Sequence, residues 1–360
     1  MSYCTHRSAR PRSCLPTITP DMSQPLRVAC IGCGLRAEIY MASALHVPMM
    51  RVQAHADVRQ DSADRFLGRF GGEYATTDVQ RVLHDPNVDA VIISTWHDTH
   101  TAFAVEAARS GKHVLLEKPM ALNIDECWRI EEAAGRAGIT LCVGLKMRFM
   151  PIVRKVHALV PAPVLLTGQM MNDRVPDASW SLQPGIGGGT VLGAGCHTAD
   201  LLCYLAGAAP VEVYACGGNA VHKTDGLTDT LAGSIKFANG VVASLVHGDP
   251  GRNPYASTFF CQVFGLNSGA CLYDRYRRAT LWGLDQSALG VVDLDETERA
   301  DVEGDTALLQ HFVVCALNRR PCEVGAREGR LATTLMVKML ESARSGQPQQ
   351  IEADWRSHYG

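Results

Sequence analysis

Short apolar runs alternate with helical patterns through the first half of the chain. The run Leu26–Ile31 ends at a glycine, and an uninterrupted run of this kind is typical of a strand buried on both faces of a parallel sheet. The same pattern predicts strands at 52–56, 90–94, 113–116 and 140–144, and helices after the first glycine, at 102–109 and at 124–137. This alternation predicts a doubly wound parallel sheet, the Rossmann arrangement, over residues 25–145.

The pattern changes after Pro151, because predicted strands then follow one another without a helix between them. These strands are expected at 164–171, 211–215, 231–237, 241–246 and 258–264. Asn239-Gly240 lies between two of them and predicts a hairpin, since both residues tolerate positive φ. With helices expected at 196–205 and 327–343, residues 146–351 are predicted to form an α+β domain with a large, mostly antiparallel, open sheet.

The composition argues against several classes of protein. With 46% hydrophobic and 20% charged residues, the 360-residue chain is typical of a globular protein of two domains. A formal net charge of −3 argues against a nucleic-acid partner, which would require a basic surface. No apolar run reaches the length that spans a bilayer, so no membrane partner is expected.

The two ends of the chain are expected to lie outside the domains. Residues 1–24 contain arginines and prolines but no apolar stretch, so they predict a disordered tail and not a secretory signal, with Met22 as an alternative start. Residues 352–360 are expected to form a C-terminal tail. The protein is therefore expected in the cytoplasm, with its thirteen cysteines reduced. Cys30 and Cys33 have C-x-x-C spacing, but no second Cys or His pair stands nearby, and no metal is expected.

A glycine-rich segment between the first strand and the first helix predicts a dinucleotide site. Gly32-Cys33-Gly34-Leu35-Arg36-Ala37 fits G-x-G-x-x-G/A, in which the first glycine permits a tight turn and the second lets the backbone approach a pyrophosphate. The helix N-terminus would meet the negative charge with free N–H groups and its positive dipole end. The residues of this loop expected to contact the cofactor are Gly32, Gly34, Leu35, Arg36 and Ala37.

An acidic residue after the next strand indicates which dinucleotide is bound. Asp57 follows Gly32 by 25 positions, where a carboxylate can accept hydrogen bonds from the ribose hydroxyls. It would also repel a 2′-phosphate, so NAD is expected over NADP. Arg59 is a second expected contact of the cofactor and argues in the other direction, because a nearby arginine can accommodate that phosphate.

Further elements stand in a spacing that resembles a known family. Glu117-Lys118-Pro119 directly follows a predicted strand, the segment 94–100 precedes it, and Gly195-Cys196-His197-Thr198-Ala199-Asp200 follows later. Together with the segment 144–149, they resemble the glucose–fructose oxidoreductase / inositol dehydrogenase / MocA (Gfo/Idh/MocA) family over residues 25–351.

The resemblance implies NAD(P)-dependent hydride transfer at a carbinol or keto carbon of a sugar, amino sugar or polyol. It also implies that the open sheet mediates a homo-oligomer, a dimer or a tetramer. Lys118 and His197 match the family's catalytic residues. Further contacts expected near the cofactor are Thr95, Trp96, His100, Glu117, Lys118 and Arg148. Contacts expected with the substrate are Lys118, Arg148, Asn172, Trp180, His197 and Asp200.

The chemistry of these residue types agrees with the resemblance. When hydride leaves a carbinol carbon, the hydroxyl proton must leave as well, and an imidazole can accept it. A lysine ammonium beside the oxygen stabilises the developing negative charge. Lys118 stands at the carboxyl end of a predicted parallel strand, where such sheets bind ligands, and His197 and Asp200 are three apart on a predicted helix.

The sequence departs from the family pattern at three positions. Gly193 stands where an acid usually lies four residues before the catalytic histidine, so the expected Lys–Asp–His arrangement is incomplete. Trp96 replaces a common proline, and Ser181 a common arginine. A dehydrogenase or ketoreductase is expected, and the altered pocket would suit a modified sugar. Two alternatives remain: an NAD-dependent glycosidase or epimerase that uses transient oxidation, and a non-catalytic dinucleotide-binding regulator.

Overall fold

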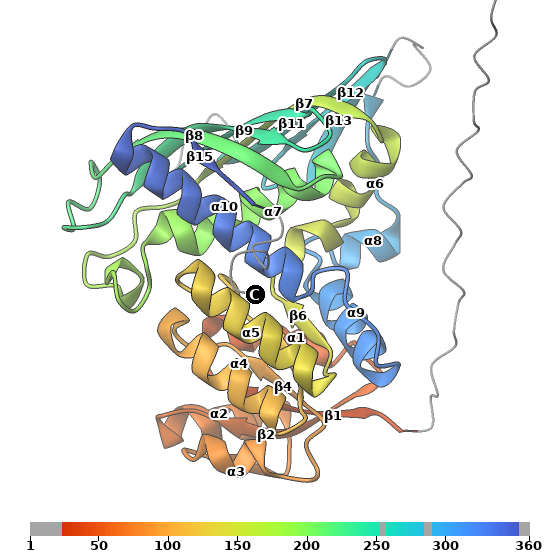
Figure 1. The fold of residues 1–360 in the computed structure, drawn as a ribbon. Coiled ribbons are helices and arrows are strands. Elements are labelled where there is room, and N and C mark those ends of the chain that lie inside the picture. Colours follow the sequence, from red (N-terminus) through yellow and green to blue (C-terminus); the bar gives the residue numbers. More distant parts are fainter. Residues whose placement is uncertain (1–23, 252–256, 284–289, 353–360) are drawn as a thin grey trace, which may run out of the picture.

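The structure, a computed structural model, describes residues 24–251, 257–283 and 290–352. Apart from Gln24 and Glu352, the two tails expected from the sequence lie outside the described residues. Figure 1 shows two layered regions, one around each sheet, joined by helices that lie between them. No helix in the described part of the chain has the length and apolar character needed to cross a membrane.

The first region is built on a parallel sheet of six strands. Its spatial order is β3-β2-β1-β4-β5-β6, the order of a dinucleotide-binding fold. The strands are β1 (Leu26–Ile31), β2 (Met50–Ala56), β3 (Tyr74–Thr76), β4 (Ala90–Ile93), β5 (His113–Leu116) and β6 (Leu141–Val143). The helices are α1 (Leu35–Ala44), α2 (Gln60–Phe70), α3 (Val79–Leu83), α4 (His100–Arg109) and α5 (Ile124–Ala137), with a 3-10 turn η1 (His97–Thr99). Strands β1, β4, β5 and β6 are almost wholly buried, which explains their uninterrupted apolar sequences.

The second region is built on a mixed sheet of nine strands, ordered β14-β13-β12-β11-β7-β10-β9-β8-β15. Among the strands that the structure describes in this sheet, β7 and β10 are the one parallel pair, and the other pairs are antiparallel. The strands are β7 (Pro163–Met171), β8 (Pro210–Gly218), β9 (Thr230–Phe237), β10 (Val242–Gly248), β11 (Phe259–Gly265), β12 (Ser268–Tyr273), β13 (Arg278–Gly283), β14 (Gly290–Val291) and β15 (Gln349–Gln350). The predicted hairpin at Asn239-Gly240 joins β9 to β10, with Gly240 at φ +88°.

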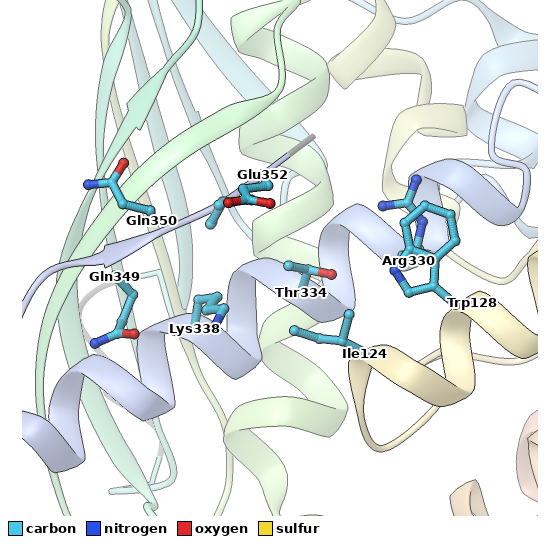
Figure 2. A pocket seen from close by; sticks show the side chains of 9 residues that line it. Ile124, Trp128, Arg330, Thr334, Lys338, Gln349, Gln350 and Glu352 are labelled. Carbon is cyan, nitrogen blue, oxygen red and sulfur yellow. The ribbon is translucent and has the colours of Figure 1, made fainter. Parts of the chain in front are cut away.

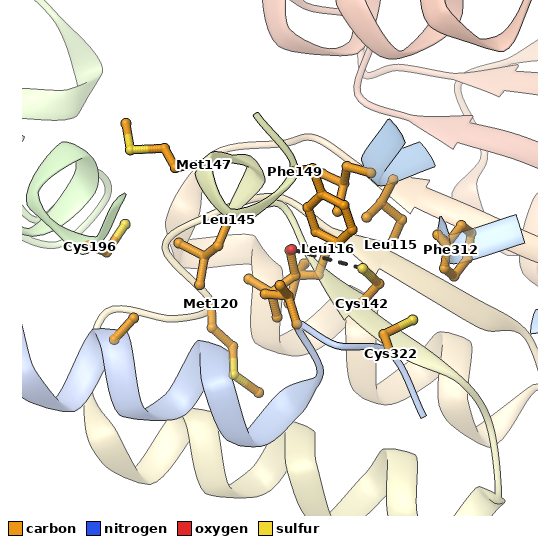
Figure 3. Close-up of a cluster of buried hydrophobic side chains, with 14 of the residues drawn as sticks. Leu115, Leu116, Met120, Cys142, Leu145, Met147, Phe149, Cys196, Phe312 and Cys322 are labelled. Atoms are coloured by element: carbon orange, nitrogen blue, oxygen red, sulfur yellow. Dashed lines mark hydrogen bonds between the residues drawn. The ribbon is translucent and has the colours of Figure 1, made fainter. Parts of the chain in front are cut away.

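Helices cover one face of this second sheet and reach back to the first region. They are α6 (Pro151–Leu159), α7 (Thr190–Ala206), α8 (Glu296–Ala300), α9 (Asp305–Leu317) and α10 (Ala326–Ser345), with 3-10 turns η2 (Lys146–Phe149) and η3 (Trp180–Leu182). Helix α10 contacts both α7 and α5, and α9 contacts α1 (Figure 1). Figure 3 shows the buried cluster at this junction, where Leu116 and Cys142 of the first sheet lie near Phe312 of α9.

The predicted fold class is confirmed, but several element boundaries were wrong. The helix predicted at 196–205 begins at Thr190, so Gly193 and Gly195 lie inside it. Glycine usually weakens a helix, but here neighbours occupy the space of the absent side chains: a Cβ on Gly195 would lie 2.6 Å from Met336 Cε. The prediction also omitted β3, β12–β15, α2, α3, α6, α8 and α9. The omitted strands have only two to six residues, α3 and α8 have five each, and α9 has apolar residues on most of its faces, so these elements leave little pattern. Helices α2 and α6 are amphipathic, and the prediction missed them despite that pattern.

Candidate active site

The glycine loop after β1 has the geometry that its sequence predicts. Gly32 has φ +88°, and a Cβ there would lie 2.5 Å from the carbonyl oxygen of Ser94 at the end of β4. An alanine would therefore be strained and would also collide with the backbone. Gly32 is thus fixed by the fold itself, independently of any ligand.

Gly34 has a different role, because it borders open space. It precedes α1 with no side-chain cap, and a Cβ on Gly34 would have nothing within 4 Å. The next residue, Leu35, is 87% exposed. The first N–H groups of α1 therefore face outward with no side chain in front of them, which suits a pyrophosphate. Ala37 is fully buried, as a residue that lets helix and strand pack closely should be. This loop fits the dinucleotide that its sequence predicts.

Asp57 lies directly after β2 and holds the loop in place. Its Oδ2 accepts the N–H of Cys33 (2.7 Å), and its Oδ1 accepts the N–H of Arg59 (2.9 Å). Each carboxylate oxygen can accept more than one hydrogen bond, so ribose hydroxyls can still bind. The Arg59 guanidinium pairs with exposed Asp61 at 2.5 Å. Arg59 is thus engaged with an acid in the first turn of α2.

Glu117, expected near the cofactor, lies at the centre of a buried polar cluster after β5. Its Oε1 accepts hydrogen bonds from Arg36 Nε (2.7 Å) and Tyr40 Oη (2.6 Å), and its Oε2 accepts the N–H of Lys118 (3.0 Å). Burial alone would raise the pKa of Glu117, but the charges of Arg36 and Lys118 and these hydrogen bonds lower it to about 2. Glu117 is therefore ionised, and the Arg36 side chain is directed to it and not into the open space at Gly34.

Arg36 also joins the two regions of the molecule. Its Nη2 lies 2.6 Å from Asp305 at the start of α9, and Asp305 in turn contacts Lys146 at 2.8 Å. Lys146 continues to Glu303 at 3.1 Å. The helix that follows the phosphate loop is thereby tied to the second region through alternating charges.

The segment after β4 places Thr95 against the glycine loop and His100 between the loops after β4 and β5. The Thr95 methyl group lies beside Gly32, and its hydroxyl contacts that of Thr99 at 2.6 Å. His100 is fully buried, with Nδ1 2.9 Å from the Pro119 carbonyl oxygen and Nε2 3.3 Å from that of Thr95. His100 therefore joins the loops after β4 and β5 and has no surface exposed to a ligand.

Lys118 lies at the carboxyl end of β5, beside the second region. The Lys118–Pro119 peptide bond is cis. The Lys118 Nζ donates to the carbonyl oxygen of Gly193 on α7 (2.9 Å) and has no acidic partner among the described residues. Gly193, which stands where the family pattern expects an acid, therefore contacts Lys118 through its backbone carbonyl and not through a side chain.

His97 fills the space that the absent side chain of residue 193 leaves. A Cβ on Gly193 would lie 3.1 Å from His97 Cε1. His97 is 8% exposed, and its Nδ1 lies 2.8 Å from the carbonyl oxygen of Gly187. Burial, then His100 and Lys118, lower the pKa of His97 to about 3, so the ring is neutral.

Two tryptophans close this side of the site. Trp96 stacks on Trp180, with ring centroids 5.8 Å apart, and Trp180 meets His97 edge-on at 4.8 Å. Trp96 remains 52% exposed, so it stands at the rim. The structure thus brings together two predicted contacts, one expected at the cofactor and one at the substrate. Sequence reasoning missed His97, although its position between Trp96 and His100 in a segment before β5 was a usable signal.

His197 lies one turn along α7 from Gly193 and is partly buried. Burial, followed by the Lys118 ammonium, holds the pKa of His197 well below its ordinary value. Its Nδ1 is sealed from solvent and has no hydrogen-bond partner among the described residues. The predicted lysine and histidine are therefore close enough to interact electrostatically, but the histidine has no polar group that orients its ring.

Asp200 and Arg148 form a buried ion pair. Asp200 Oδ1 and Oδ2 accept Arg148 Nη2 (2.6 Å) and Nε (2.8 Å), and the carboxylate is 1% exposed. A two-pronged pair of this kind is geometrically well defined but leaves neither group free. Asp200, which the sequence predicts as a substrate contact, is thus engaged in holding η2 to α7.

Asn172 belongs to a buried network at the ends of β7 and β10. Its Nδ2 lies 3.3 Å from both His247 Nε2 and Asp249 Oδ1. Asp249 is fully buried and also accepts the Thr190 hydroxyl and contacts His222 Nε2 at 3.3 Å. Burial lowers the pKa of His247 to about 4, with Asp249 opposing the shift and Lys118 adding to it. Sequence reasoning had no signal for this network, since its members are scattered over 77 positions.

Two other features in the described residues lie apart from this site. A cavity of about 250 Å³ between α5, α10 and β15 includes Arg330 and Lys338 (Figure 2), but Arg330 pairs with Glu131 and Lys338 with Glu341. Ligand-type atoms of one further group, residues 311, 315 and 322, lie within 4.8 Å of one another. The Nε2 of that histidine already accepts a backbone N–H at 2.9 Å, which occupies the lone pair that a metal would need.

Comparisons with known proteins agree with this geometry. Residues 26–145 match a family model described as an oxidoreductase family with an NAD-binding Rossmann fold. Residues 162–265 match the GFO/IDH/MocA C-terminal domain. A levoglucosan dehydrogenase in complex with NADH and levoglucosan has a similar fold, with a TM-score of 0.82 over 91% of this chain and all of that one, at 21% identity.

Two enzymes are similar over nearly the whole chain. The 1,5-anhydro-D-fructose reductase of Ensifer adhaerens is 31% identical over 351 residues, covering 91% of this chain and 98% of the relative. The scyllo-inositol 2-dehydrogenase (NAD(+)) of Bacillus subtilis (strain 168) is 25% identical over 342 residues, covering 92% and 98%. Given the two matched domains and these full-length relatives, the protein belongs to the Gfo/Idh/MocA family of oxidoreductases, with an NAD-binding Rossmann domain at residues 26–145.

Proposed function

We propose that the protein is an NAD-dependent oxidoreductase that interconverts a carbinol and a carbonyl group on a sugar, an amino sugar or a polyol. The observation that carries this proposal is the position of Lys118, at the carboxyl end of β5, with its Nζ on the Gly193 carbonyl and no acidic partner among the described residues. Inositol and anhydrofructose are the substrates named for the two relatives above, which supports a polyhydroxylated substrate.

The chain supplies charge and proton acceptance around the reacting oxygen. The nicotinamide, when bound, accepts or returns the hydride. The Lys118 ammonium hydrogen-bonds the substrate oxygen and stabilises its negative charge in the transition state. A neutral imidazole beside Lys118 accepts the hydroxyl proton, and His197 is the imidazole that the sequence pattern indicates. The Trp96–Trp180 pair supplies an apolar face against which a sugar ring can pack.

The cofactor is proposed to be NAD in preference to NADP. The Asp57 carboxylate stands after β2, where the adenosine ribose of a Rossmann cofactor lies, and it would repel a 2′-phosphate. Arg59 is the cation that could offset this repulsion, but it pairs with Asp61.

The test is a spectrophotometric screen of the purified protein. With NAD and a panel of polyols, sugars and aminoglycosides, at least one substrate should give the absorbance of reduced nicotinamide. The same panel should give no signal with Lys118→Ala. Release of a cleaved or epimerised product without net NADH would favour transient oxidation. Tight NAD binding without any turnover across the panel would favour a regulator and contradict the proposal.

The assembly is proposed to be a homo-oligomer formed through the open sheet. Leu165 on β7 pairs with Val242 on β10, and both are over 40% exposed, as is Tyr214 on β8. A Cβ on Gly168 of β7 would contact Thr198 and Leu202 of α7, so alternation along the strand puts Leu165 on the opposite face, and the strand register puts Val242 and Tyr214 there as well. Figure 1 shows no described helix on that face of the sheet. Leu165→Lys combined with Val242→Lys should shift the mass measured by light scattering to the monomer.

The described cysteines are all free thiols, which supports a reducing compartment such as the cytoplasm.

A further inference from the structure

We infer that His97 accepts the substrate's hydroxyl proton and that His197 instead donates a hydrogen bond to the same oxygen. This inference rests on the proposed function and assigns the two imidazoles roles that differ from those the sequence pattern indicates. The basis is the hydrogen bonding of the ring nitrogens that face away from the substrate. Which nitrogen of a histidine carries the proton is set by the partner of the other one.

The tautomer of His97 is fixed by its partner on the second region. Its Nδ1 lies 2.8 Å from the carbonyl oxygen of Gly187, which can only accept. Nδ1 of the neutral ring therefore carries the proton, and Nε2 keeps its lone pair. Nε2 has no hydrogen-bond partner among the described residues and is not sealed from solvent. His97 thus keeps an unprotonated ring nitrogen that no described residue occupies.

The ring is also held firmly in place. The N–H of Asp98, the next residue, donates to the Ile186 carbonyl oxygen (3.1 Å), so two hydrogen bonds join η1 to the loop at 183–189. The rings of Trp180 and His97 pack edge to face. His97 Cε1 lies against Gly193, whose carbonyl oxygen accepts the hydrogen bond of Lys118 Nζ. The proton acceptor and the ammonium are therefore positioned by the same turn of α7.

His197 has the opposite arrangement. Its Nδ1 is sealed from solvent with no partner among the described residues, whereas its Nε2 is not sealed. A proton on Nδ1 would be a buried unsatisfied donor, which is costlier than an unused acceptor lone pair. The neutral ring therefore carries its proton on Nε2. In that form it cannot accept a proton at Nε2, but it can donate a hydrogen bond to the substrate oxygen.

The step balances as an ordinary alcohol oxidation. The carbon–hydrogen bond breaks and its electron pair leaves as hydride to the nicotinamide, while the O–H proton passes to His97 Nε2 and the carbonyl double bond forms. Lys118 and His197 Nε2–H both donate to the oxygen as its charge develops. Charged and titratable groups that face His97 are His100 on α4 and Glu117 and Lys118 after β5. In the reverse direction, protonated His97 returns the proton.

Two isosteric variants separate the roles. His97→Asn keeps an amide N–H that can reach the Gly187 carbonyl but removes Nε2, so kcat should fall by about 100-fold while KM and the NAD dissociation constant change less than about 3-fold. His197→Gln places an amide N–H near the position of Nε2, so kcat should fall by less than about 10-fold. Exposed His46→Asn is the control for handling and folding and should equal the wild type.

A second measurement needs no turnover. Nuclear magnetic resonance of isotope-labelled histidine side chains in the full-length protein should show the proton on Nδ1 of His97 and on Nε2 of His197. An inactive His197→Gln beside an active His97→Asn would overturn the inference, and so would full activity in both. If both variants are inactive, a proton on His197 Nδ1 overturns it and a proton on His197 Nε2 supports it. A wild type that oxidises no member of the panel contradicts the proposed function, whereas the tautomers still test this inference.

Discussion

Glycines shape both the cofactor loop (residues 32–37) and the proposed substrate wall, by which we mean Trp96, His97, Trp180 and Gly193. What occupies the place of the missing side chain differs between them. At Gly32 it is the backbone of Ser94, directly after β4, and at Gly34 it is open space. At Gly193 it is a protein side chain, the His97 ring. The cofactor loop therefore follows its sequence pattern closely, because backbone geometry and phosphate chemistry fix it. The substrate wall departs from the family pattern because His97, which that pattern does not include, occupies the space beside Gly193.

The largest expected effect is on kcat and tests the residues around the substrate wall. Lys118→Ala should lower kcat by about 1000-fold, because the transition-state charge loses its cationic partner. The NAD dissociation constant, measured by fluorescence titration, should stay within a few-fold of the wild type. Lys338→Ala, which removes a lysine that pairs with Glu341 on α10, is the matched control and should leave kcat unchanged. Substantial turnover by the Lys118 variant would remove the role assigned to that residue.

The next effect tests the two glycines of the loop against each other. Gly32→Ala should lower the free energy of unfolding by about 3 kcal/mol, because the new Cβ adds a collision with Ser94 to an unfavourable φ. Gly34→Ala should change it by less than about 0.5 kcal/mol, since the Cβ points into open space. The same variant should weaken NAD binding at least about 10-fold. Chemical denaturation without cofactor and NAD titration measure the two quantities; unweakened binding in Gly34→Ala would mean that the pyrophosphate lies elsewhere.

A third prediction concerns the acid limit of stability. The pKa of Glu117 is lowered to about 2, below its ordinary value near 4.5. The stabilisation is therefore fully present above about pH 4.5 and is lost as the pH falls toward 2, by up to about 3 kcal/mol. Glu117→Gln should show a shallower loss of stability over that window in denaturation curves. Glu341→Gln, at a surface pair, should keep the wild-type slope, and parallel curves for the two variants would contradict the assignment.

The smallest effect tests the choice of cofactor. Asp57→Ala should weaken NAD binding by about 10-fold and NADP binding by less, because one carboxylate both binds ribose and repels the 2′-phosphate. Asp61→Ala releases Arg59 and should improve NADP binding alone. Titrations of both dinucleotides measure the ratio. An unchanged preference in both variants would show that these loops do not select the cofactor.

The sequence predicted the parts of the molecule that depend on local rules. The uninterrupted apolar strands, the Asn239-Gly240 turn and the spacing of the glycine loop each report a backbone requirement at their own position. The contact between His97 and Gly193 could not be read in this way, because it joins residues 96 positions apart through packing between two regions. The pairing of Arg148 with Asp200 was hidden for the same reason: spacing on a helix shows which residues share a face, not which neighbour that face meets.

The chain of ion pairs from Glu117 through Arg36 and Asp305 to Lys146 has a consequence for the thermal unfolding of the protein. Helix α1 follows the phosphate loop, and α9 belongs to the second region. A dinucleotide bound at the phosphate loop therefore stabilises both regions of the molecule. Ligand binding to the native state raises the unfolding midpoint of every element that unfolds with the site. The protein should therefore show one calorimetric transition that moves as a whole when NAD is added. Asp305→Asn, which weakens this link, should split that transition and leave its upper component insensitive to the cofactor.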